Sequence, residues 1–136
     1  MTTILILSTD LNPNQSLRQT LEANGFFVDI QALNPDQFSL TIQSRAPDLI
    51  VLDLSRSNGK APEICRAVRN VNTAPMVVLS TSNAPEMVAA VLDAGADDYL
   101  VKPVSNQILF ASISKLTRRS SYNHGILPAV DQAKFS

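Results

Sequence analysis

The sequence predicts an α/β fold in which five strands and five helices alternate, a (βα)5 unit. Short, nearly continuous aliphatic runs are typical of strands that are covered on both faces, as in a parallel sheet. Between these runs, apolar residues recur at helical spacing and the segments are bounded by Pro, Ser and Gly. Right-handed crossovers then favour a doubly wound, five-stranded parallel sheet in the order 2-1-3-4-5.

The strands are expected at residues 4–7, 26–32, 48–52, 76–79 and 98–101. The helices are expected at residues 13–23, 35–44, 62–71, 85–94 and 105–117. Gly25 suits the C-terminal cap of the first helix, Pro62 suits the first turn of the third, and Ser105 is an expected N-cap of the fifth. Cys65 is expected to be a small core residue of the third helix.

Length and composition fit a single domain of ordinary globular balance, with 136 residues, 45% hydrophobic residues and a net charge of −1. A net charge of −1 does not indicate the excess of positive charge that is typical of proteins that bind nucleic acid or an anionic membrane. A single cysteine excludes an intrachain disulfide and a cysteine metal cluster. The one histidine, His124, lies in a polar C-terminal stretch, which argues against a His-based triad or a His-rich metal site. No apolar run approaches the roughly 18 residues of a membrane span, so a cytoplasmic location is expected.

Three predicted strands end in polar side chains that suit a phosphoryl group: Asp53, Ser80 and Lys102. In a doubly wound sheet, ligands bind outside the carboxyl ends of the strands. A carboxylate can accept the phosphoryl group, an ammonium can neutralise its charge, and a hydroxyl can donate a hydrogen bond to it. The first strand ends at the same edge in Ser8, Thr9 and Asp10.

The stretches ILIL, LEANGFFV, PDLIVLDL, PMVVLS and above all AGADDYLVKP resemble a response-regulator receiver domain of the CheY-like type. Segment lengths and KLTRR near the end of the fifth helix resemble the OmpR/PhoB branch of that family. The resemblance implies a receiver domain over residues 1–119. Residues 120–136 are then a linker or tail, and by analogy a C-terminal DNA-binding domain is expected beyond them.

The resemblance implies a role for each polar strand end. Asp53 holds the position of the phosphoacceptor, Ser80 that of the hydroxyl that follows the phosphate, and Tyr99 that of the aromatic switch. Lys102 and Pro103 are the family Lys-Pro pair. The implied function is phosphorelay signalling in a two-component system with a histidine kinase as partner, without enzyme activity beyond phosphoacceptance.

The metal site departs from the family pattern, because Ser8 and Thr9 occupy the two positions where receivers carry Mg²⁺-binding acids. Two neutral hydroxyls supply no charge to a hard cation. Either Asp10 completes a Mg²⁺ site with Asp53, directly or through water, or the domain binds no Mg²⁺ or binds it weakly. The first hypothesis is an atypical receiver that signals without conventional phosphorylation. The alternatives are a conventional receiver phosphorylated on Asp53 and a flavodoxin-like domain that binds a small molecule.

The expected signalling surface consists of the fourth helix, the fifth strand and the fifth helix, which form a dimer face in the OmpR/PhoB branch. Val88 and Ile108 align with a Lys–Glu pair of that face, so an apolar contact replaces a charged one. Asp97 and Asp98 with Arg119 remain as the expected charge pairs. The expected partner is a second copy or another regulatory protein, unless Val88 and Ile108 lie nearer the core.

Overall fold

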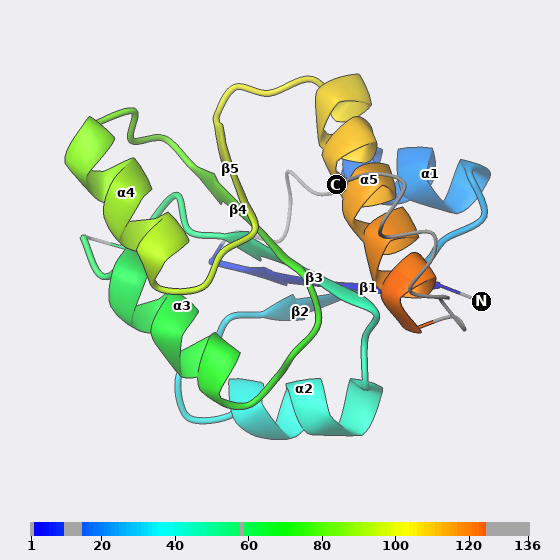
Figure 1. Cartoon of the computed structure of the whole chain (residues 1–136), viewed down its shortest axis with the longest axis horizontal. Coiled ribbons are helices and arrows are strands. Elements are labelled where there is room, and N and C mark those ends of the chain that lie inside the picture. Colours follow the sequence, from blue (N-terminus) through cyan, green and yellow to red (C-terminus); the bar gives the residue numbers. More distant parts are fainter. Residues whose placement is uncertain (1, 10–14, 58, 125–136) are drawn as a thin grey trace, which may run out of the picture.

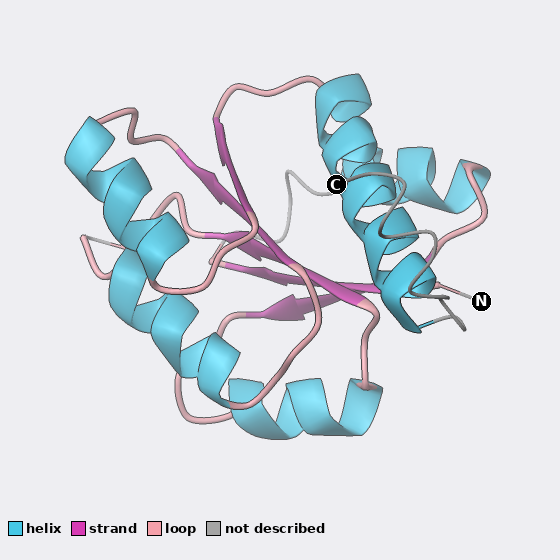
Figure 2. Cartoon of the chain, in the orientation of Figure 1, coloured by secondary structure: helices cyan, strands magenta, loops and turns pink. Residues whose placement is uncertain are grey.

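The computed structural model describes residues 2–9, 15–57 and 59–124, with side chains as far as residue 118. Strands and helices alternate along the chain, as Figures 1 and 2 show, and the predicted fold class is confirmed. The elements are β1 (Thr3–Ser8), α1 (Gln15–Ala23), β2 (Phe27–Ala32), α2 (Phe38–Arg45), β3 (Leu49–Asp53), α3 (Ala61–Asn70), β4 (Met76–Ser80), α4 (Pro85–Asp93), β5 (Asp98–Val101) and α5 (Asn106–His124). All strand pairs are parallel, in the order β2-β1-β3-β4-β5.

Helices cover both faces of the sheet, as the continuous aliphatic runs predict (Figure 1). One apolar cluster joins the sheet to α2, α3 and α4, and includes the fully buried Cys65 of α3. The other joins the sheet to α1 and α5 through side chains such as Leu21 and Ile113. Every residue of β3 and β4 is buried, whereas β5, at the edge of the sheet, is only partly covered. The central strands therefore hold their C-terminal ends in a fixed position.

The predicted helix boundaries are confirmed where the capping signals are strong. Gly25 has the positive φ of a helix C-terminus, and the Ser105 hydroxyl accepts the N–H of Ile108, as an N-cap does. The end of α5 is different, because the helix continues to His124 instead of ending at residue 117. The seven residues that follow Thr117 contain no Gly or Pro, and the first such residue is Gly125. Within the described residues, no helix is long and apolar enough to cross a membrane.

Candidate functional site

The carboxyl ends of β1, β3, β4 and β5 lie on one side of the sheet and bring the predicted site residues together, and we call this site the crevice. Ser8 at the end of β1 is the register partner of Asp53 at the end of β3. On the other side of β3, Asp53 pairs with Leu79, and Ser80 pairs with Val101 of β5. Because β1, β3, β4 and β5 are parallel, this register places Ser8, Asp53 and Ser80 side by side at the carboxyl ends of their strands.

Asp53 and Lys102 make a direct ion pair at the base of this crevice. Lys102 Nζ lies 2.7 Å from Asp53 Oδ2, and the Asp53 side chain is only 1% exposed. The Lys102 backbone N–H also donates to the carbonyl of Ser80, and the Lys102–Pro103 peptide bond is cis. A charge-assisted contact of this length is strong, and the buried carboxylate depends on it because burial removes the water that would otherwise solvate it.

Ser55 is a residue of the crevice that the sequence analysis did not identify. Its hydroxyl donates to Asp53 Oδ1 over 2.7 Å, and its backbone N–H donates to the same oxygen over 3.3 Å. Oδ1 and Oδ2 of Asp53 are therefore both engaged, one by Ser55 and the other by Lys102. The sequence did contain a signal for this contact, because Ser and Asp side chains two residues apart commonly form a hydrogen bond across a short turn.

Ser80, Ser82 and Tyr99 form a second set of contacts beside the ion pair. The Ser80 hydroxyl accepts the backbone N–H of Ser82, and the Tyr99 hydroxyl donates to the Ser82 carbonyl over 2.8 Å. Tyr99 is half-buried and packs against the core cluster under α3 and α4. The bond from Tyr99 connects the β4–α4 loop to β5 and keeps the tyrosine ring partly buried.

The described side chains do not match the ligand set that Mg²⁺ prefers. Ser8 is buried at the end of β1 and Thr9 is exposed, while Asp10 lies outside the described residues. Among the residues that are described, no three acidic, His or Cys side chains come together. Asp53 offers one carboxylate, and both of its oxygens already accept hydrogen bonds. Of the predicted metal ligands, Asp53 is thus the one whose carboxylate lies in the described part of the chain.

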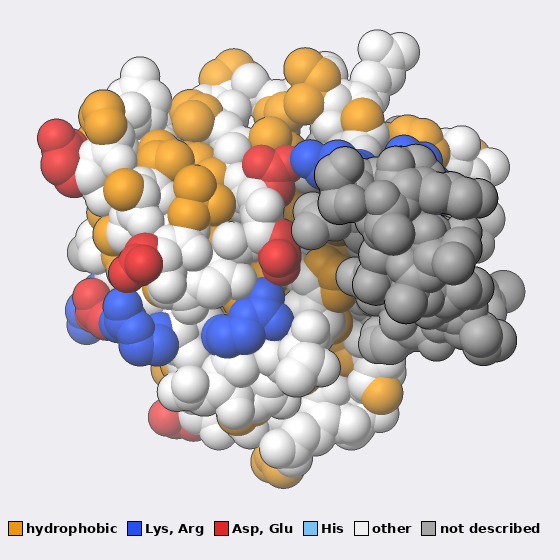
Figure 3. Space-filling model, viewed as in Figure 1, with side chains coloured by type: hydrophobic (Ala, Val, Ile, Leu, Met, Phe, Trp, Pro, Cys, Tyr) orange, Lys and Arg blue, Asp and Glu red, His pale blue; other side chains and the backbone are white. Residues whose placement is uncertain are grey.

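The α4–β5–α5 face carries exposed aliphatic side chains. Ile108 is 57% exposed, so it does not belong to the core. Val88 is half-buried. Leu92 of α4 and Val101 of β5 are also exposed. Figure 3, which looks onto this side of the molecule, shows hydrophobic side chains gathered over α4.

The two acidic residues at the start of β5 are engaged within the chain. Asp97 pairs with Arg69 of α3, with 3.1 Å between Nη2 and Oδ2. Asp98 Oδ2 accepts the hydroxyl of Ser112 over 2.6 Å. The side chain of Arg119 lies outside the described part of the chain, so its pairing with either acid stays a prediction.

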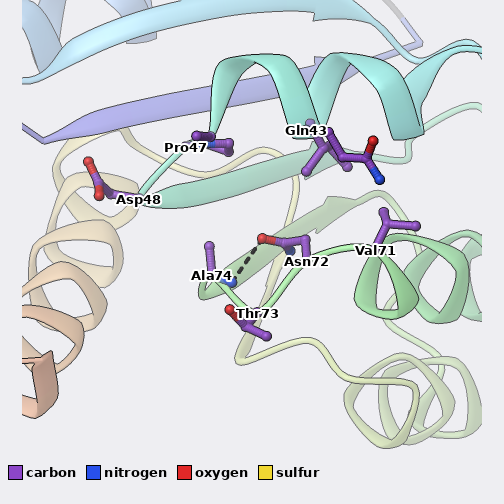
Figure 4. Close-up of a pocket in the computed structure, with 9 residues that line it drawn as sticks. Gln43, Pro47, Asp48, Val71, Asn72, Thr73 and Ala74 are labelled. Carbon is purple, nitrogen blue, oxygen red and sulfur yellow. Dashed lines mark hydrogen bonds between the residues drawn. The ribbon is translucent and has the colours of Figure 1, made fainter.

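A separate pocket of about 330 Å³ lies at the opposite edge of the sheet, near the starts of β3 and β4. Figure 4 shows it between α2 and the loop that joins α3 to β4, where Asn72 Oδ1 accepts the N–H of Ala74. Two segments line it, with Ile42, Gln43, Ala46, Pro47 and Asp48 from the first and residues 71–74 from the second. None of the predicted site residues lines this pocket, so it is distinct from the crevice.

Comparison with known proteins identifies the family of this chain. The family model of the response regulator receiver domain matches residues 4–114. The chain is 35% identical over 123 residues to the response regulator MprA of Mycobacterium sp. (strain KMS), covering 90% of this chain and 53% of that protein. It is 37% identical over 121 residues to the KDP operon transcriptional regulatory protein KdpE of Escherichia coli (strain K12), covering 89% of this chain and 53% of that protein. The chain thus spans about half the length of the curated relatives it matches.

Solved structures give the same assignment. A two-component response regulator from Clostridium difficile superposes with a TM-score of 0.79 at 35% identity, covering 88% of this chain and 98% of that chain. A CheY-like receiver domain protein from Methanospirillum hungatei JF-1 has the same fold, with a TM-score of 0.79 at 22% identity, covering 90% and 98%. The matches described here name response regulators, and none supports the flavodoxin-like alternative. The chain belongs to the response regulator receiver domain family.

Proposed function

We propose that this receiver domain signals without conventional phosphorylation of Asp53. The observation that carries the proposal is the 2.7 Å contact between Lys102 Nζ and Asp53 Oδ2 in a buried setting. In this arrangement Lys102 already compensates the negative charge of Asp53 within the chain. The ionised carboxylate is stabilised by Lys102 and by the hydrogen bonds from Ser55, without any need for a metal ion.

The substitutions at the end of β1 support the same proposal. With Ser8 and Thr9 in place of two acids, the crevice loses two negative charges that would otherwise repel Asp53 and attract Mg²⁺. Phosphoryl transfer depends on such a cation to neutralise the developing charge on the phosphoryl oxygens. We therefore expect Mg²⁺ to bind weakly and the phosphorylated state to be poorly populated.

The signal then passes through the α4–β5–α5 face to a second copy of the domain or to another regulatory protein. Aliphatic residues such as Ile108 can pack against a partner without a change of charge in the crevice. The net charge of −1 makes direct DNA binding by this domain unfavourable, so DNA contact belongs to a further domain of the whole protein. The stimulus reaches the domain through a histidine kinase only if Asp53 accepts phosphate.

The proposal is tested by titrating the chain with Mg²⁺, alone and with beryllofluoride, while amide NMR signals around the crevice are recorded. A parallel sample is incubated with Mg²⁺ and acetyl phosphate and its intact mass is measured. The expected result is no saturation at millimolar Mg²⁺ and no stable phosphoryl adduct.

The matched control is Asp53→Asn, which keeps the size of the side chain but removes the carboxylate nucleophile. Saturable binding at millimolar Mg²⁺, together with an adduct of one phosphoryl group that Asp53→Asn abolishes, contradicts the proposal. That outcome would instead support the conventional receiver that a histidine kinase phosphorylates.

A further inference from the structure

We infer that Ser55 is a positioning residue that holds Asp53 in an unreactive state, and this inference rests on the proposed function above. The Ser55 hydroxyl and backbone N–H both donate to Oδ1 of Asp53, at 2.7 and 3.3 Å. The hydroxyl bond is the one that a substitution can remove. Ser55 thus acts on the oxygen that Lys102 does not contact.

The two contacts together hold both oxygens of the carboxylate. Lys102 Nζ binds Oδ2 over 2.7 Å, and Asp53 as a residue has no exposed surface. A carboxylate attacks a phosphorus atom with an oxygen lone pair, and hydrogen bonds donated to that oxygen lower its electron density. Each oxygen keeps a further lone pair, but a carboxylate that accepts hydrogen bonds at both oxygens and is shielded from water is a weaker nucleophile and is less free to turn toward phosphorus.

The reaction that Ser55 opposes can be written with acetyl phosphate as the donor. An oxygen of Asp53 forms a bond to phosphorus, and the bond between phosphorus and the acetate oxygen breaks. Acetate leaves with the electron pair of that bond, and no proton is transferred between the two. In the acyl phosphate product the carboxyl group has lost its full negative charge, so a hydrogen bond from Ser55 stabilises it less than it stabilises the free carboxylate.

Ser57 provides a matched comparison in the same loop. It is partly buried like Ser55, and its backbone N–H donates to the Leu54 carbonyl. Both serines therefore have similar burial and similar local turns, but the Ser55 hydroxyl bonds to Asp53 whereas Ser57 shows no such bond among the described contacts. Any effect of a serine hydroxyl on loop folding alone should be shared by both.

The experiment measures the rate at which Asp53 takes up a phosphoryl group from acetyl phosphate with Mg²⁺, by intact mass. It compares the unmodified chain, Ser55→Ala, Ser55→Thr and Ser57→Ala, each also combined with Thr9→Asp. Thr9 is exposed, so Thr9→Asp is compatible with folding while it returns one acid to the crevice. We expect Ser55→Ala to raise the rate by about tenfold, because the loss of one hydrogen bond to a charged group changes a rate constant by roughly a factor of ten.

Ser55→Thr keeps the hydroxyl and is expected to retain the slow rate, and Ser57→Ala is expected to change nothing. In the Thr9→Asp background, the inference is overturned if Ser55→Ala shows no phosphoryl uptake, if its rate equals that of Ser57→Ala, or if Ser55→Thr is as fast as Ser55→Ala. These ratios are independent of the parent rate. Rapid uptake by the unmodified chain would instead count against the proposed function.

Discussion

The guanidinium of Arg69 lies 3.1 Å from the carboxylate of Asp97, and this pair ties α3 to the turn between α4 and β5. Arg69 also donates to the carbonyls of Gly95 and Ala74, at 2.7 and 2.8 Å. The same oxygen of Asp97 accepts the N–H of Met76 at the start of β4. One arginine side chain therefore joins α3, the loop that follows it and the turn before β5.

Replacement of Arg69 by Met is expected to lower the free energy of unfolding by about 1–3 kcal/mol, because partly buried carbonyl acceptors lose their donor. Urea denaturation measures this change. Arg66→Met is the control, since Arg66 lies on the same helix but is exposed, and its replacement should stay within about 0.5 kcal/mol. Equal effects of the two substitutions would show that the contacts of Arg69 carry no stability.

Gly95→Ala is expected to be more damaging than Gly25→Ala, although both glycines have positive φ. A Cβ at Gly95 would come within 3.0 Å of Arg69 Cγ, whereas a Cβ at Gly25 would meet nothing within 4 Å. Gly25→Ala thus reports the backbone strain alone, which exceeds about 1 kcal/mol. Thermal or urea unfolding of both variants measures the difference, and Arg69→Ala should recover part of the loss in Gly95→Ala. A strictly additive double variant argues against the steric contact.

Lys102→Met is expected to destabilise the fold by about 3–5 kcal/mol, because it leaves the buried Asp53 carboxylate without its cation. The double variant with Asp53→Asn is expected to lose less than Lys102→Met alone, since no buried charge remains. Chemical denaturation of the single and double variants gives the coupling energy. A coupling near zero would mean that the ion pair of the structure does not persist in solution.

The Cys65 thiol is expected to resist modification in the folded protein. Burial raises the pKa of Cys65 from 9.0 to about 11, with Arg69 and Arg66 opposing part of the shift. Because the folded pKa lies above the unfolded one, its contribution to stability is complete below pH 9 and is lost as pH rises through 11. Thiol titration with a disulfide reagent at pH 8 should be slow without denaturant and rapid with it. Rapid labelling of the folded chain contradicts this prediction.

Ile108→Asp is expected to weaken any self-association about tenfold or more, because a charge would be placed inside an aliphatic contact. Association of the unmodified chain should persist at high salt, since such a contact is not screened. Sedimentation velocity at two salt concentrations measures both effects. Leu40→Asp on α2 is the control, as Leu40 is exposed on a different helix and should leave association unchanged.

The strands and the crevice could be predicted from the sequence because both depend on short-range patterns. Aliphatic runs define the buried strands, and in a parallel sheet the next polar residues must lie at one edge. Ser8, Asp53 and Ser80 lie there as predicted. Lys102 follows the end of β5 on the same side of the sheet, and its ammonium contacts Asp53.

Other contacts could not be predicted, because they depend on the angle of side chains and on the packing of distant segments. The bond from Ser112 to Asp98 and the pairing of Arg69 with Asp97 join residues whose spacing carries no motif. The length of α5 was underestimated because its polar end shows no apolar period, although nothing in it stops a helix. The pocket could not be predicted from the sequence either, since its walls come from two segments that are far apart along the chain.

The hydrogen bond from Tyr99 to the Ser82 carbonyl gives the domain a built-in optical reporter. The chain has no tryptophan and two tyrosines, so emission from a single phenol near the crevice is not hidden by a stronger fluorophore. A phenol that donates to a carbonyl absorbs and emits differently from one in water. With Tyr122 replaced by Phe, ultraviolet difference spectra can follow the state of the β4–α4 loop without any attached label.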